Sequence, residues 1–330
     1  VRPRSHREAA SIVRGEGGVR YRLPVLKAGG LDVLDHLKEG LLEPDALVDV
    51  RGLRRAEDAP PVERSDDRVL IDASATLAVI ARDPVVRGSL PALADAAGSA
   101  ATPQVRAVAT AAGNLLQRPR CWYYRNDQFD CLKKGGDRCF AIDGENAYHA
   151  ILGGASCHIV HPSNLAVAMM VLDGRVHLVG GERESLPIAE LYQSPARGVR
   201  REHVLEPGEV VTHLSLSPAP MSSFLAIKHK RSFDWPLACA AAAITIEGGR
   251  IRTARVCGGA VAPVPWPLPQ VEAALVGVDP RDDAAVRSAC ADAAAGARPL
   301  RENAYKATLL PVVVRRAVRL AAGLPETEDA

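Results

Sequence analysis

Four of the seven cysteines lie within one stretch of the chain, residues 121–157. They are separated by nine, seven and seventeen residues, and they are Cys121, Cys131, Cys139 and Cys157. Four thiolates on an irregular loop that contains glycine could hold a cubane iron-sulfur cluster, because each iron takes one soft sulfur ligand. The spacing matches neither the compact ferredoxin run nor a CxxC zinc ribbon. Two disulfides or unpaired core thiols therefore remain open as alternatives.

Paired glycines near the N-terminal end form a second candidate site. Gly29 and Gly30 follow a short apolar segment, residues 24–26, that we expect to be a strand, and they precede a helical pattern from Leu31 onward. Backbone amides exposed before a helix attract phosphate. Glycine is also the usual residue wherever φ must be positive, so a purely structural turn remains the alternative.

Small residues are crowded together between positions 108 and 114. Such a segment presents a backbone surface that a flat or narrow group can approach closely, although tight helix or strand packing explains it equally well. We expect residues 102–105 to interrupt the preceding helical pattern and Gly113-Asn114 to form a turn.

Composition places the chain among compact globular proteins. Its 330 residues suffice for two or three domains, 47% of them are hydrophobic, and the formal net charge is +2. So small an excess of positive charge implies no nucleic-acid partner. The charged N-terminal segment and the lack of a long apolar run predict neither a signal peptide nor a membrane span. Apolar surroundings predict that Cys239, Cys257 and Cys290 are small core residues.

The patterns along the chain predict an α+β protein. Strand patterns occupy residues 46–50 and 68–74, and helical patterns occupy 75–80 and 93–97. A proline-containing segment, residues 217–223, is typical of a linker. Beyond it we expect three strands, at residues 225–231, 241–247 and 251–259. Helices should follow at 271–275, 284–295 and 309–322, with an irregular crossing at 298–306. An antiparallel sheet covered by helices follows from this order.

Three stretches together resemble the FAD-binding subunit of the xanthine dehydrogenase, or molybdenum hydroxylase, family. They are AGGLDVL at 28–34, ATAAGNLLQRPRCWYYR at 109–125 and HPSNLAVAM at 161–169. Further landmarks follow in the family's order at 205–216, 228–241, 258–265 and 297–318, so the resemblance covers nearly the whole chain. The NLLQRPRC stretch resembles the subset with a cluster-bearing insertion, which includes periplasmic aldehyde oxidoreductases and 4-hydroxybenzoyl-CoA reductases.

The resemblance implies a specific architecture. Residues 1–217 should form a two-lobed FAD-binding domain of the vanillyl-alcohol-oxidase/PCMH type, with lobes at 1–60 and 61–217. FAD should lie between the lobes, with an iron-sulfur loop at 121–157. Residues 218–330 should form a C-terminal α+β domain with an antiparallel three-stranded sheet and helices.

The resemblance also implies which residues bind the cofactors. The family's first loop, which binds the pyrophosphate, matches Ala28, Gly29, Gly30, Leu31, Asp32, Val33 and Leu34. Its second loop matches Thr110, Gly113 and Asn114, and its segment near the flavin matches His161, Ser163 and Asn164. Its basic position near the isoalloxazine matches Lys228 and Lys230. Leu31 replaces the usual Thr, Ala112 a usual Gly, and Asn164 a common Asp. A solvated basic run is the alternative for the two lysines.

In the same way, the resemblance implies that Cys121, Cys131, Cys139 and Cys157 hold a 4Fe-4S cluster. Basic residues flank these cysteines in the sequence, namely Arg118, Arg120, Arg125, Lys133, Lys134 and Arg138. We expect them to offset the negative charge of the cluster.

By resemblance, the chain is the electron-transfer subunit of an oxidoreductase and has no catalytic residues of its own. Its partners would be a large molybdenum-cofactor subunit and a small subunit with two 2Fe-2S clusters, in a heterotrimer or its dimer, together with an external electron acceptor. Electrons would pass from molybdenum through the 2Fe-2S clusters to FAD and then to that acceptor. We expect His158, His161 and His213 to be structural or to lie near the flavin.

The nine- and seventeen-residue cysteine spacings resemble those of periplasmic aldehyde oxidoreductases, whereas the seven-residue spacing resembles that of the 4-hydroxybenzoyl-CoA reductases. We therefore favour an aldehyde oxidoreductase over a 4-hydroxybenzoyl-CoA reductase or a xanthine or N-heterocycle dehydrogenase. A stand-alone flavoprotein oxidase is the alternative from another class. The expected location is the cytoplasm, or the periplasm if a partner with a twin-arginine signal exports the complex.

Overall fold

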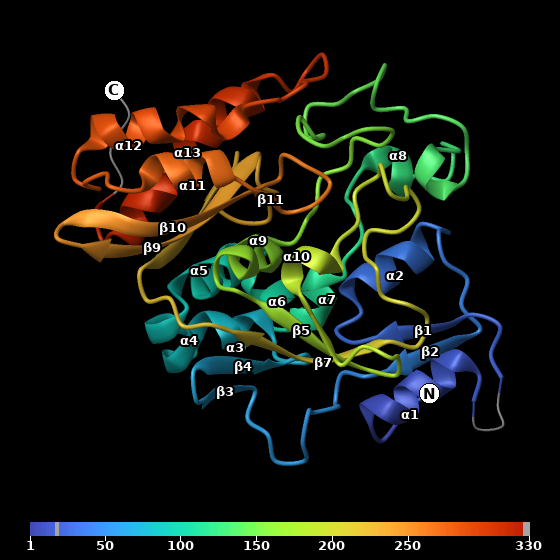
Figure 1. The fold of residues 1–330 in the computed structure, drawn as a ribbon. Coiled ribbons are helices and arrows are strands. Elements are labelled where there is room, and N and C mark those ends of the chain that lie inside the picture. The colour runs from blue at the N-terminus through green and yellow to red at the C-terminus, as the bar shows by residue number, and fades with distance from the viewer. Residues whose placement is uncertain (17–19, 326–330) are drawn as a thin grey trace.

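Three β-sheets organise the chain in the computed structural model, which describes residues 1–16 and 20–325 (Figure 1). A two-stranded parallel sheet lies near the N-terminus, a five-stranded sheet follows it, and a four-stranded sheet lies in the C-terminal part of the chain. Helices fill the space between the two larger sheets and cover the outer face of the last one (Figure 1).

The N-terminal sheet pairs β1 (Pro24–Lys27) with β2 (Ala46–Asp49) in parallel. Parallel strands need a crossover connection, and α2 (Leu31–Lys38) provides it. The preceding helix α1 (His6–Arg14) buries Ala9 and Ala10 against Val48. This small unit places the paired glycines between β1 and α2.

The five-stranded sheet has the order β3-β4-β7-β5-β6, and all of its neighbouring strands are antiparallel. Its strands are β3 (Val62–Ser65), β4 (Arg68–Asp72), β5 (Arg175–Val179), β6 (Ser185–Pro187) and β7 (Val210–Leu216). The helices of this part are α3 (Leu77–Arg82), α4 (Pro84–Ser89), α5 (Pro91–Ser99), α6 (Pro103–Arg106), α7 (Ala111–Leu115), α8 (Trp122–Arg125), the 3-10 helix η1 (Leu132–Lys134), α9 (Asn164–Val171) and α10 (Ile188–Leu191).

The C-terminal sheet has the order β11-β10-β9-β8 and is antiparallel. Its strands are β8 (Ser222–Ile227), β9 (Ala238–Glu247), β10 (Arg250–Gly259) and the two-residue β11 (Trp266–Pro267). Its helices are α11 (Pro269–Leu275), α12 (Asp283–Cys290), the 3-10 helix η2 (Ala291–Ala294) and α13 (Tyr305–Ala321). The three predicted strands are present, and β11 adds a fourth.

Strand β9 joins two hydrophobic cores. Cys239 and Ala241 pack into the core that contains α9, whereas Ala238 and Ala240 pack into the core beneath α13. Alternate residues of a strand point to opposite faces, so the alanine-rich sequence of β9 fits a strand that is buried on both sides. Because one core crosses position 217, the division of the chain into domains at that point stays a prediction, as do the lobe limits.

The predicted α+β class is confirmed, and the C-terminal helices follow the predicted order. Two local predictions need correction. The helical pattern is interrupted, since α5 ends at Ser99, but residues 103–105 are helical because they begin α6, whose N-terminus is capped by the side chain of Thr102. Gly113 and Asn114 lie inside α7 rather than at a turn, since Thr110 caps that helix.

The cysteine stretch, residues 121–157, contains α8 and η1 and is otherwise irregular. In Figure 1, α8 lies near α2, and Arg125 of α8 forms an ion pair with Asp32 of α2. Within residues 1–16 and 20–325, no helix combines the length and the apolar character needed to cross a bilayer.

Candidate functional site

The two glycines between β1 and α2 are required for different reasons. Gly30 has φ +82° and caps α2, whose first turn has no side-chain cap. Gly29 lies so close to the carbonyl group of Val108 that a Cβ atom would collide with it. The amides at the start of α2 are therefore free of side-chain partners, which suits a phosphate group. Leu31 and Leu34, on the same helix, are exposed.

The carboxylate of Asp32 faces the cysteine stretch. It accepts the backbone N–H of Arg118 at 2.9 Å and a guanidinium N–H of Arg125 at 2.8 Å, and it pairs with Arg120 at 3.1 Å. Three arginine residues therefore satisfy the Asp32 carboxylate without a phosphate group. A contact between Asp32 and a pyrophosphate stays a prediction.

The second glycine-containing segment is joined to the segment around residue 163. Thr110 Oγ1 accepts the N–H of Gly113 at 3.2 Å, which fixes the start of α7. The Ser163 hydroxyl donates to Asn114 Oδ1 at 2.7 Å and accepts the N–H of Ala166 at 3.0 Å, so it also caps α9. The start of α9 is thus bonded to Asn114 in α7.

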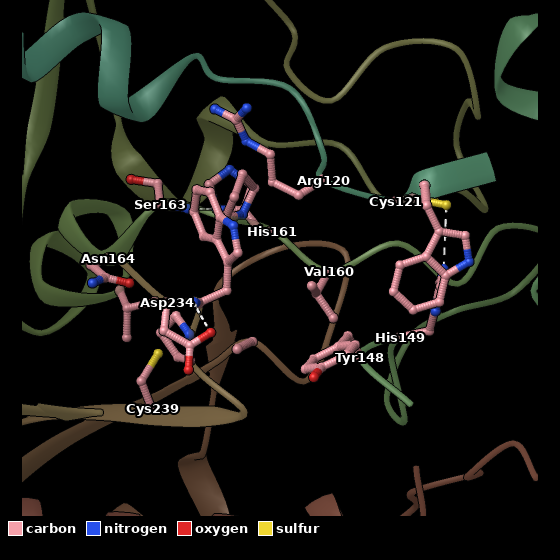
Figure 2. A pocket seen from close by; sticks show the side chains of 16 residues that line it. Arg120, Cys121, Tyr148, His149, Val160, His161, Ser163, Asn164, Asp234 and Cys239 are labelled. Carbon is pink, nitrogen blue, oxygen red and sulfur yellow. Dashed lines mark hydrogen bonds between the residues drawn. The ribbon is translucent and has the colours of Figure 1, made fainter. Parts of the chain in front are cut away.

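A cavity of about 210 Å³ lies where the start of α9 meets the C-terminal sheet (Figure 2). It is lined by Arg120, Cys121, Trp122, Tyr148, His149, Val160, His161, Pro162, Ser163, Asn164, Val167, Asp234, Trp235, Pro236, Cys239 and Ala260. Three residues that were predicted near the flavin, His161, Ser163 and Asn164, therefore line one cavity. The paired glycines lie outside it, against Val108 just before the second segment.

His161 presents a neutral ring to this cavity. Its imidazole packs edge-on against Tyr192, with ring centroids 4.2 Å apart. Burial lowers the pKa of His161 to about 3. Its Nε2 atom is buried and has no hydrogen-bond partner among the described residues. An unpaired buried nitrogen at a cavity wall is what a polar ligand would satisfy.

The two predicted lysines do not line the cavity. Lys228 is half-buried and donates to the carbonyl oxygen of Ser99, and burial lowers its pKa. Lys230 is exposed. The cation at the cavity wall is Arg120, whose guanidinium carbon lies 5.0 Å from the ring centre of Trp235. A role for either lysine beside the isoalloxazine stays a prediction.

Sequence reasoning missed Asp234 and Trp235 as residues of this cavity. Both lie within the landmark at 228–241, where the resemblance singled out Lys228 and Lys230. A tryptophan followed by proline, next to a basic run, was the available signal. Its pairing with Arg120, far away in the sequence, depends on the tertiary fold.

All four clustered cysteines line a second, smaller cavity. Its other lining residues are Tyr123, Tyr124, Leu132, Lys133, Phe140, His149 and Ile159. All seven cysteines of the chain are free thiols, so the disulfide alternative has no support in the structure. The Cys157 thiol donates toward Cys139, which lowers the pKa of Cys139 to about 5 and raises that of Cys157. The four side chains thus line one small cavity, and their role as shared ligands stays a prediction.

The cysteines are nevertheless not arranged as a finished metal site. In the part of the chain that the structure describes, no three His, Cys, Asp or Glu side chains are close enough together to hold a metal ion. The donor set fits a cluster by its chemistry, since four soft sulfur ligands share one small space. The 4Fe-4S assignment therefore belongs to the proposed function below.

Carboxylates pair with several of the cations that flank the cysteines. Buried Glu202 contacts Lys133 at 2.6 Å and Arg118 at 3.0 Å. Desolvation tends to raise the pKa of Glu202, but these two cations lower it below its ordinary value. The positive charge of Lys133 and Arg118 is therefore offset by Glu202, and less of it is available to offset the charge of a cluster.

The two cavities are adjacent, because Cys121 and His149 line both of them. Figure 2 shows these two side chains at one end of the larger cavity, joined by a hydrogen bond, with His161 and Ser163 farther along it. A group held by the cysteines would therefore lie close to a group in the larger cavity.

Comparison with known proteins supports this interpretation. Residues 1–219 match the FAD binding domain in molybdopterin dehydrogenase, and residues 223–321 match the CO dehydrogenase flavoprotein C-terminal domain. The aldehyde oxidoreductase FAD-binding subunit PaoB of Escherichia coli (strain K12) is 33% identical over 77% of this chain and 80% of its own length. The nicotinate dehydrogenase FAD-subunit of Eubacterium barkeri is 23% identical over 77% of this chain and 72% of its own length.

Solved structures show the same fold. Carbon monoxide dehydrogenase from Hydrogenophaga pseudoflava superposes with a TM-score of 0.73 at 22% identity, covering 98% of this chain and 96% of the other. Quinoline 2-oxidoreductase from Pseudomonas putida 86 gives a TM-score of 0.73 at 20% identity, covering 98% and 95%. Together with the matches over nearly the whole sequence, these findings show that the chain belongs to the family of FAD-binding subunits of molybdenum hydroxylases.

Proposed function

We propose that this chain is the FAD- and 4Fe-4S-binding electron-transfer subunit of a molybdenum-dependent aldehyde oxidoreductase. The observation that carries the proposal is the pair of adjacent cavities, one lined by four cysteines and the other by residues that match the family's flavin segment. Adjacent sites suit electron transfer, because the protein's contribution to such chemistry is to position and tune its cofactors.

The flavin would be held by two groups of residues. The free amides at the start of α2, after Gly29 and Gly30, offer hydrogen bonds to the pyrophosphate, with Thr110 and Asn114 on the facing segment. His161, Ser163, Asn164 and Arg120 line the cavity that would receive the ring system. Bound FAD supplies exchange between one-electron and two-electron carriers.

The cluster would be held by Cys121, Cys131, Cys139 and Cys157. Burial raises the pKa of Cys121 to about 11, so its thiol is protonated at neutral pH without a metal. Metal ligands must be thiolates, and binding would therefore release protons. The aromatic rings of Tyr123 and Phe140 line the smaller cavity beside these cysteines.

The reaction on the organic substrate would take place on other subunits. A large molybdenum-cofactor subunit and a small subunit with 2Fe-2S clusters are the proposed partners, together with an external electron acceptor. The similarity to the E. coli aldehyde oxidoreductase subunit supports an aldehyde as the substrate class, as does the cysteine spacing. No side chain of this chain is assigned an acid or base role.

The test is anaerobic purification of the chain with its genomic neighbours, followed by measurement of FAD, iron, acid-labile sulfide and molybdenum. Replacing Cys131 by serine should remove the cluster absorbance and leave FAD bound, whereas Cys290→Ser, in the C-terminal core, should keep both. Unchanged iron in the Cys131 variant would refute the ligand assignment. A lone, active yellow protein without molybdenum would identify a stand-alone oxidase instead.

A further inference from the structure

His149 lies in the wall between the two cavities (Figure 2). Its Nε2 atom is 3.3 Å from the sulfur of Cys121, and its ring meets Trp122 edge-on with centroids 5.1 Å apart. Its Nδ1 atom is buried without a hydrogen-bond partner within the described residues. The polar contact made by this imidazole is therefore directed at one cysteine sulfur.

The backbone around His149 is held by one segment of the C-terminal part, residues 302–306. Four consecutive carbonyl groups, those of residues 147–150, each accept a hydrogen bond from a side chain of this segment. The bonds are Tyr305 Oη to Ala147 O at 2.8 Å, Lys306 Nζ to Tyr148 O at 3.0 Å, and Asn303 Nδ2 to His149 O at 3.0 Å and to Ala150 O at 3.4 Å. Glu302 adds a reciprocal pair with Asn146, at 2.9 and 2.8 Å.

These holding side chains are themselves buried. Asn303 and Lys306 are both fully inaccessible to solvent. Burial lowers the pKa of Lys306 to about 7, and its Nζ also donates to the carbonyl of Ala260 at 2.6 Å. Burying an ammonium group is costly unless its hydrogen bonds are made. A buried lysine and a buried amide thus fix the path of residues 147–150.

We propose that His149 is a positioning residue for Cys121, donating its Nε2–H to the ligand sulfur in the wall between the two cavities. The inference rests on the proposed cluster. A thiolate can only accept a hydrogen bond, so the contact with a metal-bound Cys121 requires the tautomer with the proton on Nε2. Hydrogen bonds to cluster sulfurs set the reduction potential, and one that stabilises negative charge on sulfur raises it.

The test uses the complete complex carrying His149→Leu, with His149→Gln as the variant that keeps an N–H donor. Reductive titration followed by electron paramagnetic resonance should show a more negative midpoint potential for the 4Fe-4S signal in His149→Leu. The glutamine variant should restore the midpoint toward the wild-type value. Iron and FAD contents are measured alongside.

An unshifted 4Fe-4S midpoint in an iron-replete His149→Leu complex would overturn the inference. If the leucine variant loses its iron, retention of iron by the glutamine variant supports the donor role, and loss from both variants refutes it. A wild-type complex without iron in this chain would instead refute the proposed function, which keeps the two failures distinct.

Discussion

The carboxylate of Asp32 accepts the backbone N–H of Arg118 at 2.9 Å, across 86 positions of the sequence. This bond ties the first turn of α2, which follows the paired glycines, to the segment that leads into Cys121. Arg120 and Arg125 add ion pairs to the same carboxylate at 3.1 and 2.8 Å. The two proposed cofactor sites are thus mechanically linked, and changes on one side should be felt on the other.

Replacing Gly29 by alanine should reduce FAD retention. The added methyl group would meet the carbonyl of Val108, so the glycine turn would have to move away from the second segment. Overpacking of this kind costs about 1–3 kcal/mol. The measurement is FAD content per chain after gel filtration, together with the thermal unfolding midpoint.

The matched control is Gly52→Ala, because a Cβ atom there would meet no atom within 4 Å. Equal FAD contents in the two variants would show that the contact between Gly29 and Val108 does not shape the flavin site.

Replacing Ser163 by alanine should lower stability by about 1 kcal/mol, the usual cost of losing a helix N-cap. The same change leaves Asn114 Oδ1 without the hydroxyl that it accepts from, at the rim of the proposed flavin cavity. We expect weaker FAD binding as well, measured by fluorescence titration of the apoprotein. Ser163→Thr keeps the hydroxyl and should bind FAD as the wild type does; if it binds as poorly as the alanine variant, the hydroxyl is not the cause.

Replacing Glu202 by glutamine should destabilise the chain by about 3 kcal/mol, because it leaves buried Lys133 without a compensating charge. Chemical denaturation of the apoprotein measures this loss. Glu206→Gln is the control, since the Glu206 side chain is 65% exposed in its ion pair with Arg201. Similar losses in both variants would mean that the burial of the Lys133 pair carries no special weight.

Acid should weaken the fold through histidines that are buried in the neutral form. The pKa of His213 is lowered to about 4 by burial and by His177, whose ring stacks on it with centroids 4.1 Å apart. The unfolded chain takes up a proton near the ordinary pKa of 6.5, so the free energy of unfolding should fall as pH drops from about 6.5 toward 4. Above pH 6.5 this contribution is fully present.

Urea unfolding between pH 4 and 8 measures this dependence. His213→Gln removes the titrating group and should flatten the slope in that window. An unchanged slope in the variant would assign the acid sensitivity to other groups, such as fully buried His161, whose pKa is about 3.

Much of the fold follows from local sequence patterns, and the exceptions have local causes. Helix α13 and strands β9 and β10 overlap their predicted ranges, because α13 has apolar residues at helical spacing and β9 is a continuous apolar run buried on both faces. Residues 102–105, which contain Pro103, were predicted to interrupt the helical pattern. Proline is favourable in the first turn of a helix, however, and Thr102 supplies the cap.

The residues of the two cavities also differ in how well the sequence predicts them. The cysteines and the paired glycines could be selected from the sequence because their residue types restrict what they can do, and their binding roles stay predictions. His149, Asp234 and Trp235 were not found, since a histidine or a tryptophan becomes part of a site only through its neighbours in space. The partners of His149 are Cys121 and a segment more than 150 positions away.

The hydrogen bonds from residues 302–306 to residues 147–150 have a consequence for biosynthesis. Asn303 and Lys306 follow the carbonyls of His149 and Tyr148 by 154 and 158 positions. A ribosome therefore releases the cysteines long before it adds the residues that fix their loop. The hydrogen bonds that fix this loop can form only after residue 306 has been made, so we expect loading of the proposed cluster to follow that point.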